Sequence, residues 1–133
     1  MEIVKDIVAS NGGIEWLPEK SPLLVNIDPE NHFTIEHIGF SPHGLPAVSV
    51  SYFRNDHGPE WFRRVLFEVT DLGWLPYHIF SRHDAIVMNV YKLDKKGRIE
   101  KTDRKVRAEM INLVQRMDLE LEILLSPDEF VLT

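Results

Sequence analysis

The sequence predicts an α+β fold in which a mainly antiparallel sheet of about four to six strands packs against a long C-terminal helix. Short runs that alternate between apolar and polar residues fill the middle of the chain, as in half-buried strands. A sustained apolar spacing of three and four residues follows them, as in an amphipathic helix. Because the strands follow one another without intervening helices, antiparallel pairing is favoured. The 133 residues match the commonest domain size, so we expect one domain over residues 1–133.

The first element expected is a short helix over residues 2–10. Four apolar residues recur at the spacing of one helix face: Ile3, Val4, Ile7 and Val8. The run Asn11-Gly12-Gly13 should end this helix, because these residues tolerate the left-handed conformation that helix C-termini often need.

The strands expected next are separated by turns rich in Pro, Gly, Asp and Asn, whose backbones or side chains favour turn geometry. The alternation is clearest where Val48, Val50 and Tyr52 share one face. The predicted strands cover residues 23–27, 32–40, 47–54, 64–70, 74–81 and 84–93, of which 74–81 is expected to be short and irregular around its proline.

The C-terminal helix is predicted over about residues 103–125. Thr102 or Asp103 can serve as its N-cap, and Pro127 ends it. Residues 130–132 are expected to form a terminal strand or a tail. The helix carries one apolar stripe at positions 106, 110, 113, 114, 117, 121 and 124.

The composition argues against several classes of protein. The chain has no cysteine, which removes disulfides, zinc ribbons, iron–sulfur clusters and thiol nucleophiles and fits the cytoplasm. No segment approaches the roughly 18 apolar residues of a membrane helix, and the N-terminus lacks a signal-peptide pattern. There is no phosphate-binding glycine loop, dinucleotide fingerprint or nucleophile elbow. We therefore expect a cytoplasmic protein without a cofactor, a metal or membrane contact.

The charge is unevenly distributed along the chain. Residues 92–107 contain eight basic and three acidic residues, a net +5, whereas the formal charge of the whole chain is −6. The basic residues could contact nucleic-acid phosphates, with Tyr91 as a stacking aromatic, or they could simply form a solvated hairpin tip. The interleaved acids and the acidic remainder favour the second reading. The candidate binding residues here are Lys95, Lys96, Arg98, Lys101 and Arg104.

A second candidate binding segment is the run Trp61-Phe62-Arg63-Arg64. Tryptophan, other large aromatics and arginine dominate protein interfaces, so this run predicts a partner-binding surface. The alternative is that these aromatics cap the open end of the core. Trp74 is better explained in that second way.

Six histidines are the first acid–base candidates: His32, His37, His43, His57, His78 and His83. Asp56 precedes His57 and Asp84 follows His83, and a histidine beside a carboxylate suits general acid–base or metal chemistry. These four residues are the candidate catalytic set of a metal-dependent or acid–base hydrolase. The alternative is that most of the histidines are simply polar turn residues.

The order of segments also resembles a known family. Runs Phe33–Gly39, Ala47–Glu60 and Val65–Val69, then Leu75-Pro76-Tyr77, Asn89-Val90-Tyr91 and the C-terminal helix, resemble a family of small uncharacterised α+β domains from plasmids and phages. The likeness covers about residues 33–120. Gly58-Pro59-Glu60 stands where that family has Asp-Pro-Glu. The resemblance implies an α+β fold and a mobile-element setting, and it implies no activity.

These observations together favour a non-catalytic binding or regulatory domain that contacts another protein. The hydrolase centred on Asp56, His57, His83 and Asp84 is one alternative, and nucleic-acid binding through residues 92–107 is another. An open edge strand would also allow two copies to pair as a homodimer.

Overall fold

A computed structural model describes residues 2–27, 31–54, 62–82 and 85–125 of the chain, with side chains up to residue 120. The helices are α1 (Glu2–Ser10), α2 (Leu17–Lys20) and α3 (Arg104–Leu125). The strands are β1 (Leu23–Asn26), β2 (Asn31–Phe40), β3 (Pro46–Arg54), β4 (Phe62–Thr70), β5 (Gly73–Ser81), β6 (Ile86–Asn89), β7 (Tyr91–Leu93) and β8 (Ile99–Thr102).

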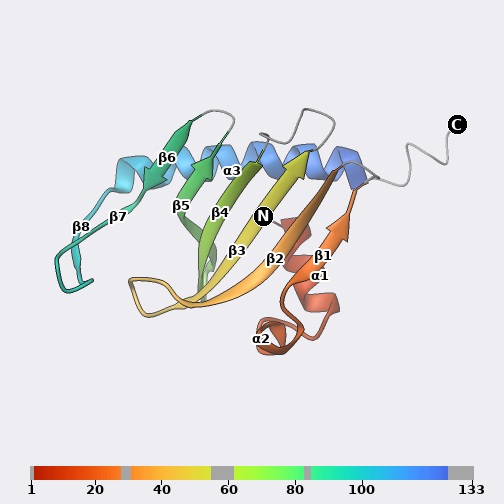
Figure 1. Cartoon of the computed structure of the whole chain (residues 1–133), viewed down its shortest axis with the longest axis horizontal. Helices are drawn as coiled ribbons and strands as arrows, with labels where there is room; N and C mark the ends of the chain where they lie inside the picture. The colour runs from red at the N-terminus through yellow and green to blue at the C-terminus, as the bar shows by residue number, and fades with distance from the viewer. Residues whose placement is uncertain (1, 28–30, 55–61, 83–84, 126–133) are drawn as a thin grey trace, which may run out of the picture.

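Strands β1 to β6 form one antiparallel sheet in which each strand pairs with its neighbour in the sequence (Figure 1). Strands β7 and β8 form a separate two-stranded hairpin at one end of the molecule. The predicted α+β class and the mainly antiparallel sheet are therefore confirmed.

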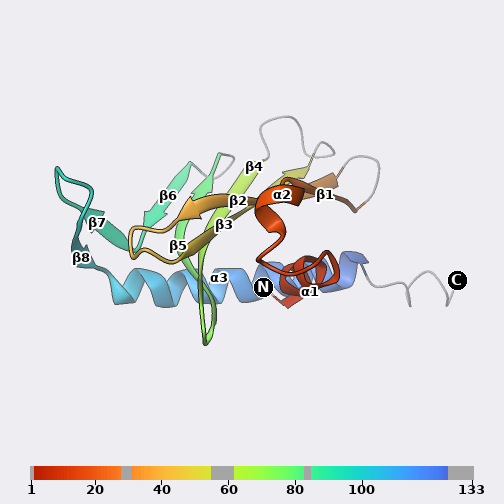
Figure 2. The same ribbon diagram turned by 90° about the horizontal axis from the view of Figure 1, so that it is seen from below.

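Helices α1 and α3 lie on one side of the six-stranded sheet, and no helix of the described residues covers the other side (Figure 2). Helix α3 runs across the strands, and α1 packs beside the C-terminal half of α3. The turn between β4 and β5 bends past α3 (Figure 2). We call the uncovered side the open face.

The core lies between the sheet and the helices because the alternating apolar residues pair across neighbouring strands. Ile35, Val50 and Val65 are consecutive partners in the register, and each is fully buried. Met110 and Val114 of α3 cover this layer, and α1 and α2 add Val4, Val8 and Leu17. The predicted strand alternation at residues 47–54 thus points its apolar side at the helices.

Helix α3 begins as its sequence predicts. The Asp103 carboxylate accepts a hydrogen bond of 3.0 Å from the Val106 amide, which is the contact of an N-cap residue. Among the described side chains, positions 110, 114 and 117 of the predicted stripe are buried. Helix α1 also ends as predicted: Gly12 has a φ of +100°, a conformation that strains residues with a Cβ.

Two strand predictions need correction. Strand β5 has nine residues and is therefore not short, but it is irregular beside Pro76 as expected, because Tyr77 is skipped between the pairs Leu66–His78 and Phe67–Pro76. The single strand expected over 84–93 is wrong. It divides at Val90, whose N–H donates to Tyr77 and whose carbonyl accepts from Asp103, so that β6 stays in the sheet while β7 turns away to pair with β8. Residues 130–132 lie outside the described part of the chain.

Candidate binding surface on the open face of the sheet

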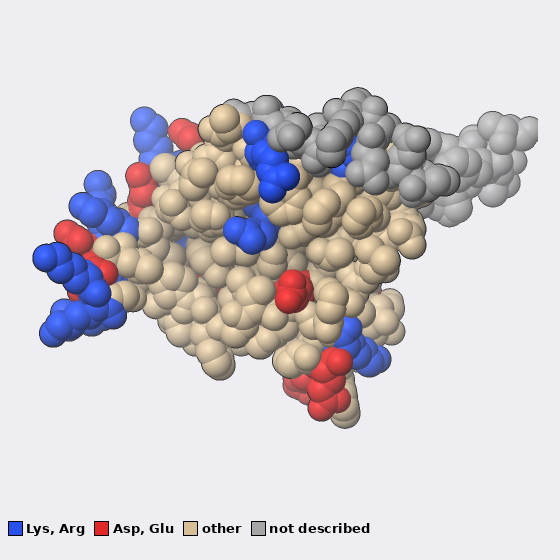
Figure 3. Space-filling view, in the orientation of Figure 1, with Lys and Arg blue, Asp and Glu red and all other residues tan. Residues whose placement is uncertain are grey.

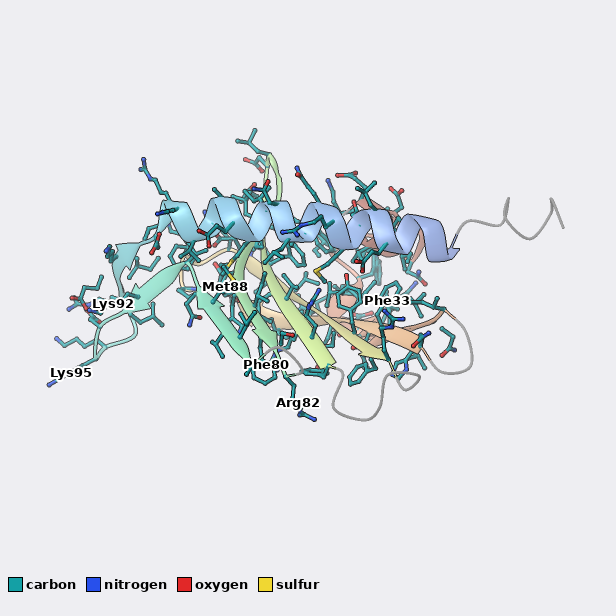
Figure 4. The ribbon with its side chains drawn as sticks, turned by 90° about the horizontal axis from the view of Figure 1, so that it is seen from above. Phe33, Phe80, Arg82, Met88, Lys92 and Lys95 are labelled. Atoms are coloured by element: carbon teal, nitrogen blue, oxygen red, sulfur yellow. The ribbon has the colours of Figure 1, made fainter. Side chains whose placement is uncertain are left out.

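The open face carries a row of aromatic side chains across four adjacent strands. His32, Phe53 and Phe62 are consecutive cross-strand partners, and Phe80 lies diagonally beyond Phe62 on β5. The ring centroids of successive members are 4.7, 5.0 and 5.9 Å apart. We call these four residues the aromatic row. In Figure 4, Phe80 points away from α3, whereas Met88 lies on the helix side.

The aromatic row is half-buried, because each ring covers part of its neighbour. Cross-strand aromatic pairs contribute roughly 0.2–1 kcal/mol each, so the row is ordered without any ligand. The Arg82 guanidinium lies 5.5 Å from the centre of the Phe62 ring, within cation–π distance. Figure 4 shows Arg82 on the same side of the sheet as Phe80.

A second row runs beside the aromatic row and spans all six strands. Its members pair in register from edge to edge: Leu24, Thr34, Ser51, Arg64, Phe80 and Val87. Arg64 is exposed at its middle, and Leu24 and Val87 at its ends are 60% and 59% exposed. In Figure 3 the described part of this side is mostly uncharged, with scattered charged groups on the strands. The surface therefore combines apolar and uncharged polar side chains with isolated arginines.

The run predicted as a binding segment divides between the two faces of the sheet. Phe62 and Arg64 lie on the open face, whereas Arg63 pairs with Tyr52 and Ser81 on the helix side and lines a pocket with Leu113 of α3. The alternation of β4 is the reason, since successive side chains point to opposite faces. That same period could have separated the two arginines from the sequence alone. Trp61 lies outside the described residues.

The histidine candidates do not meet within the described part of the chain. His57, Asp56, His83 and Asp84 all lie outside it. His32 belongs to the aromatic row, and a ring nitrogen of His78 lies 2.6 Å from the Asn89 side-chain oxygen. The Gly39 amide donates to His37, and His43 lies edge-on to Tyr91. No group of three His, Asp or Glu side chains suited to a metal ion occurs among the described residues.

A buried polar cluster joins the core to the β7–β8 hairpin, and sequence reasoning missed it. Glu68 of β4, only 1% exposed, accepts hydrogen bonds from the Ser41 hydroxyl at 2.9 Å and from the Tyr91 hydroxyl. Arg107 of α3 donates to both Glu68 and Tyr91 at 2.7 Å, and its guanidinium lies 5.2 Å from the Tyr91 ring centre. We call Ser41, Glu68, Tyr91 and Arg107 the polar cluster.

Two signals in the sequence point to the polar cluster. Glu68 interrupts the apolar part of β4, residues 65–69, and Arg107 stands three residues before Met110, a buried position of the α3 stripe. Burial, and secondarily the hydrogen bond to Glu68, raise the pKa of Tyr91. With its carboxyl oxygens held by three different side chains, Glu68 has the environment of a structural group.

The β7–β8 hairpin holds the basic segment predicted from the charge distribution. Its turn is built around Asp94, whose carboxylate accepts hydrogen bonds of 2.9 Å from the amides of Lys96 and Arg98. The backbone hydrogen bond from Arg98 is the largest cause of the lowered pKa of Asp94. Arg107 is the exception among the basic residues, since it points into the polar cluster. The remaining cations of the segment are exposed: Lys92, Lys95, Lys96, Arg98, Lys101, Arg104 and Lys105.

Two pockets in the described part of the chain have volumes of about 40 and 50 Å³. Small-molecule pockets usually measure several hundred Å³, so these two are too small for a metabolite or cofactor. The first opens near the aromatic row, between Phe53 and Met117, and the second lies between α3 and the sheet. Recognition by an extended surface fits this geometry better than enclosure of a ligand.

Comparison with known proteins finds no matching family model, no matching curated protein and no matching solved structure. The described helices include none with the length and apolar character that crossing a bilayer requires.

Proposed function

We propose that this chain is a non-catalytic binding domain of the cytoplasm that regulates or assists a partner protein, and that the open face is its partner-binding surface. The aromatic row beside the exposed Arg64 carries the proposal. Aromatic residues and arginine are the commonest hot-spot residues of protein interfaces.

The order of the aromatic row supports its role in binding. His32 stacks on Phe53, and Phe62 and Phe80 follow in tilted contacts, so these rings are already restrained and binding a partner would cost them little side-chain entropy. The exposed Leu24 and Val87 extend the apolar surface to both edges of the sheet. A third row of this face begins with Glu36, which pairs with Ser49. Among the described residues of the three rows, Glu36 is the only exposed acid, against the cations Arg64 and Arg82. Such a surface suits an apolar protein segment that carries a carboxylate.

Charge reversal at Arg64 tests the proposal. The tagged chain is expressed in its source cells, and co-purified proteins are quantified for the wild type, Arg64→Glu and Arg116→Glu. Arg116 is an exposed residue of α3, so its reversal makes the same charge change on the other side of the molecule. We expect the recovery of one co-purified protein to fall at least fivefold with Arg64→Glu and to stay unchanged with Arg116→Glu. Equal recovery from the two variants would overturn the proposal.

The recovered protein is then purified and its binding measured directly. Phe53→Thr removes an inner ring of the aromatic row and puts a β-branched residue, which favours strands, in its place. We expect it to weaken binding more than tenfold while its circular dichroism spectrum stays unchanged. Unchanged affinity would mean that the partner does not bind the open face.

The hydrolase alternative rests on Asp56, His57, His83 and Asp84, which lie outside the described residues. Elemental analysis of the purified protein tests its metal-dependent form: a stoichiometric metal that chelator removes, with a lower melting temperature, would favour it.

Pairing of two copies through the edge strands β1 or β6 is a further proposal, and light scattering after size-exclusion chromatography tests it. The cytoplasmic setting rests on the absence of cysteine, and the mobile-element setting rests on segment order alone.

A further inference from the structure

The β7–β8 hairpin and the first turn of α3 form a projecting arm at one end of the molecule, residues 91–105, which we call the basic arm (Figure 1). Figure 3 shows basic groups gathered around this end, and Figure 4 shows Lys92 and Lys95 there, away from the open face. Seven cations of the arm are exposed: Lys92, Lys95, Lys96, Arg98, Lys101, Arg104 and Lys105.

The pairing within the basic arm places like charges opposite each other. Lys92 and Lys101 are direct cross-strand partners, an arrangement that destabilises a hairpin. No ion pair links either lysine to a carboxylate in the described part of the chain. The Asp94 carboxylate already accepts a hydrogen bond from the Lys96 amide of the turn, and its Oδ2 lies 3.1 Å from Nε of Arg98. With seven cations against Asp94, Glu100 and Asp103, the arm keeps a net charge of +4, which a bound anion would neutralise.

The base of the basic arm is held firmly against the core. Tyr91, its first residue, belongs to the polar cluster, and the Asp103 amide donates a 2.7 Å hydrogen bond to the Val90 carbonyl. Arg107, which belongs to the same helix as the end of the arm, pairs with the buried Glu68. Because both ends of the arm are anchored, its cations are pre-positioned for a ligand.

We propose that the basic arm binds the phosphate backbone of double-stranded DNA without regard to sequence. A two-stranded ribbon fits the major groove, which is about 12 Å wide and bordered by phosphates on both sides. The cations lie along both strands, at the turn and at the base of the arm, as contact with two phosphate walls requires. Five of the seven are lysines, whose ammonium groups act as point charges and suit phosphates better than base edges.

Single-stranded nucleic acid is the weaker fit for this arm. Proteins that bind single strands stack bases on exposed aromatic rings beside their cations. Tyr91 is the aromatic of the arm, and it is 8% exposed and held by Glu68 and Arg107. The arm lies apart from the aromatic row, so this proposal is independent of partner binding at the open face.

Fluorescence anisotropy with a labelled 20-base-pair duplex of mixed sequence tests the proposal between 25 and 150 mM NaCl, a range chosen because backbone binding weakens steeply with salt. We expect saturable binding with a log–log salt slope of about −3 to −5, and about equal affinity for a second sequence. Lys95→Ser/Lys96→Ser should reduce the steepness of the slope by about 2, since each phosphate contact contributes about 0.9. The matched control Arg116→Ser, outside the arm, should leave the slope unchanged.

Three results would overturn the proposal. The first is a lack of saturable duplex binding at 25 mM NaCl, and the second is the same salt slope for the arm variant and the wild type. The third is preferential binding to a polyglutamate peptide, to phosphatidylserine vesicles or to a single-stranded 20-mer. Arg64→Glu should leave duplex binding intact, and the arm variant should leave recovery of the protein partner intact. The failure of one proposal is thus distinguishable from the failure of the other.

Discussion

Replacement of Arg107 by methionine should destabilise the fold by about 3–5 kcal/mol. Arg107 donates to Glu68 and to Tyr91 at 2.7 Å, and Glu68 is 1% exposed. Methionine keeps much of the side-chain volume but leaves the buried carboxyl group without its cation. Removal of one partner from a buried ion pair typically costs about 3–5 kcal/mol, because the remaining charge stays desolvated.

This free energy corresponds to a large shift in melting temperature. An unfolding entropy of about 2.1 cal/mol/K per residue gives about 280 cal/mol/K for the 133-residue chain. Each kcal/mol then lowers the melting temperature by about 3.6 °C, so we expect a fall of about 11–18 °C. Urea denaturation followed by circular dichroism measures the free energy itself. Arg104→Met, on the exposed first turn of the same helix, should change it by less than about 0.5 kcal/mol.

A double-mutant cycle decides whether the ion pair is the cause. Glu68→Gln removes the carboxylate charge while keeping a side-chain oxygen that can accept from Tyr91. Glu68→Gln/Arg107→Met should therefore be more stable than the sum of the single effects by at least about 1 kcal/mol. A cost below about 1 kcal/mol for Arg107→Met, or additivity within about 0.5 kcal/mol, would refute the reasoning.

Three further predictions concern the core, the N-cap and the tyrosines. Phe67→Ala should cost about 3–5 kcal/mol in urea denaturation because Phe67 is fully buried, and a loss under 1 kcal/mol would contradict its place in the core. Asp103→Ala should cost about 0.5–2 kcal/mol through the lost N-cap, whereas Asp103→Ser should recover most of it. Burial is the main cause of the raised pKa of each of the three tyrosines, and it raises the pKa of Tyr77 to about 12. Absorbance at 295 nm near pH 10.5 should therefore show little phenolate until the protein unfolds. Because the unfolded chain releases these protons at lower pH, stability should fall as the pH rises from about 10 towards 12, and normal titration of the folded chain would contradict this.

Much of the fold could be predicted because its signals are local. The alternation at residues 47–54 predicts a strand whose apolar side is buried, and Val48 and Val50 are indeed fully buried. The spacing of Met110, Val114 and Met117 predicts one buried helix face, and all three are buried. The residues 84–93 show the limit of this approach. Their composition favours a strand throughout, but the strand divides at Val90, whose N–H donates to Tyr77 and whose carbonyl accepts from Asp103.

The candidate binding residues show the same limit. The run Phe62-Arg63-Arg64 looks like one patch in the sequence, yet β4 presents Phe62 and Arg64 to the open face and Arg63 to the helix side. The aromatic row depends on the order of four strands, because His32 and Phe80 are 48 positions apart. No local pattern says which strands are neighbours.

By itself, the sequence determined helices α1 and α3, most of the strands of the sheet and the basic segment, since each follows from side-chain periodicity or charge within a short window. It did not indicate helix α2. The tertiary structure decided which face of the sheet remains open and that the aromatic row gathers there. It also decided that Arg107 leaves the basic arm to pair with Glu68, 39 positions away. The physical reason is that burial and cross-strand contact depend on chain segments brought together only by folding, whereas propensity and periodicity act between near neighbours.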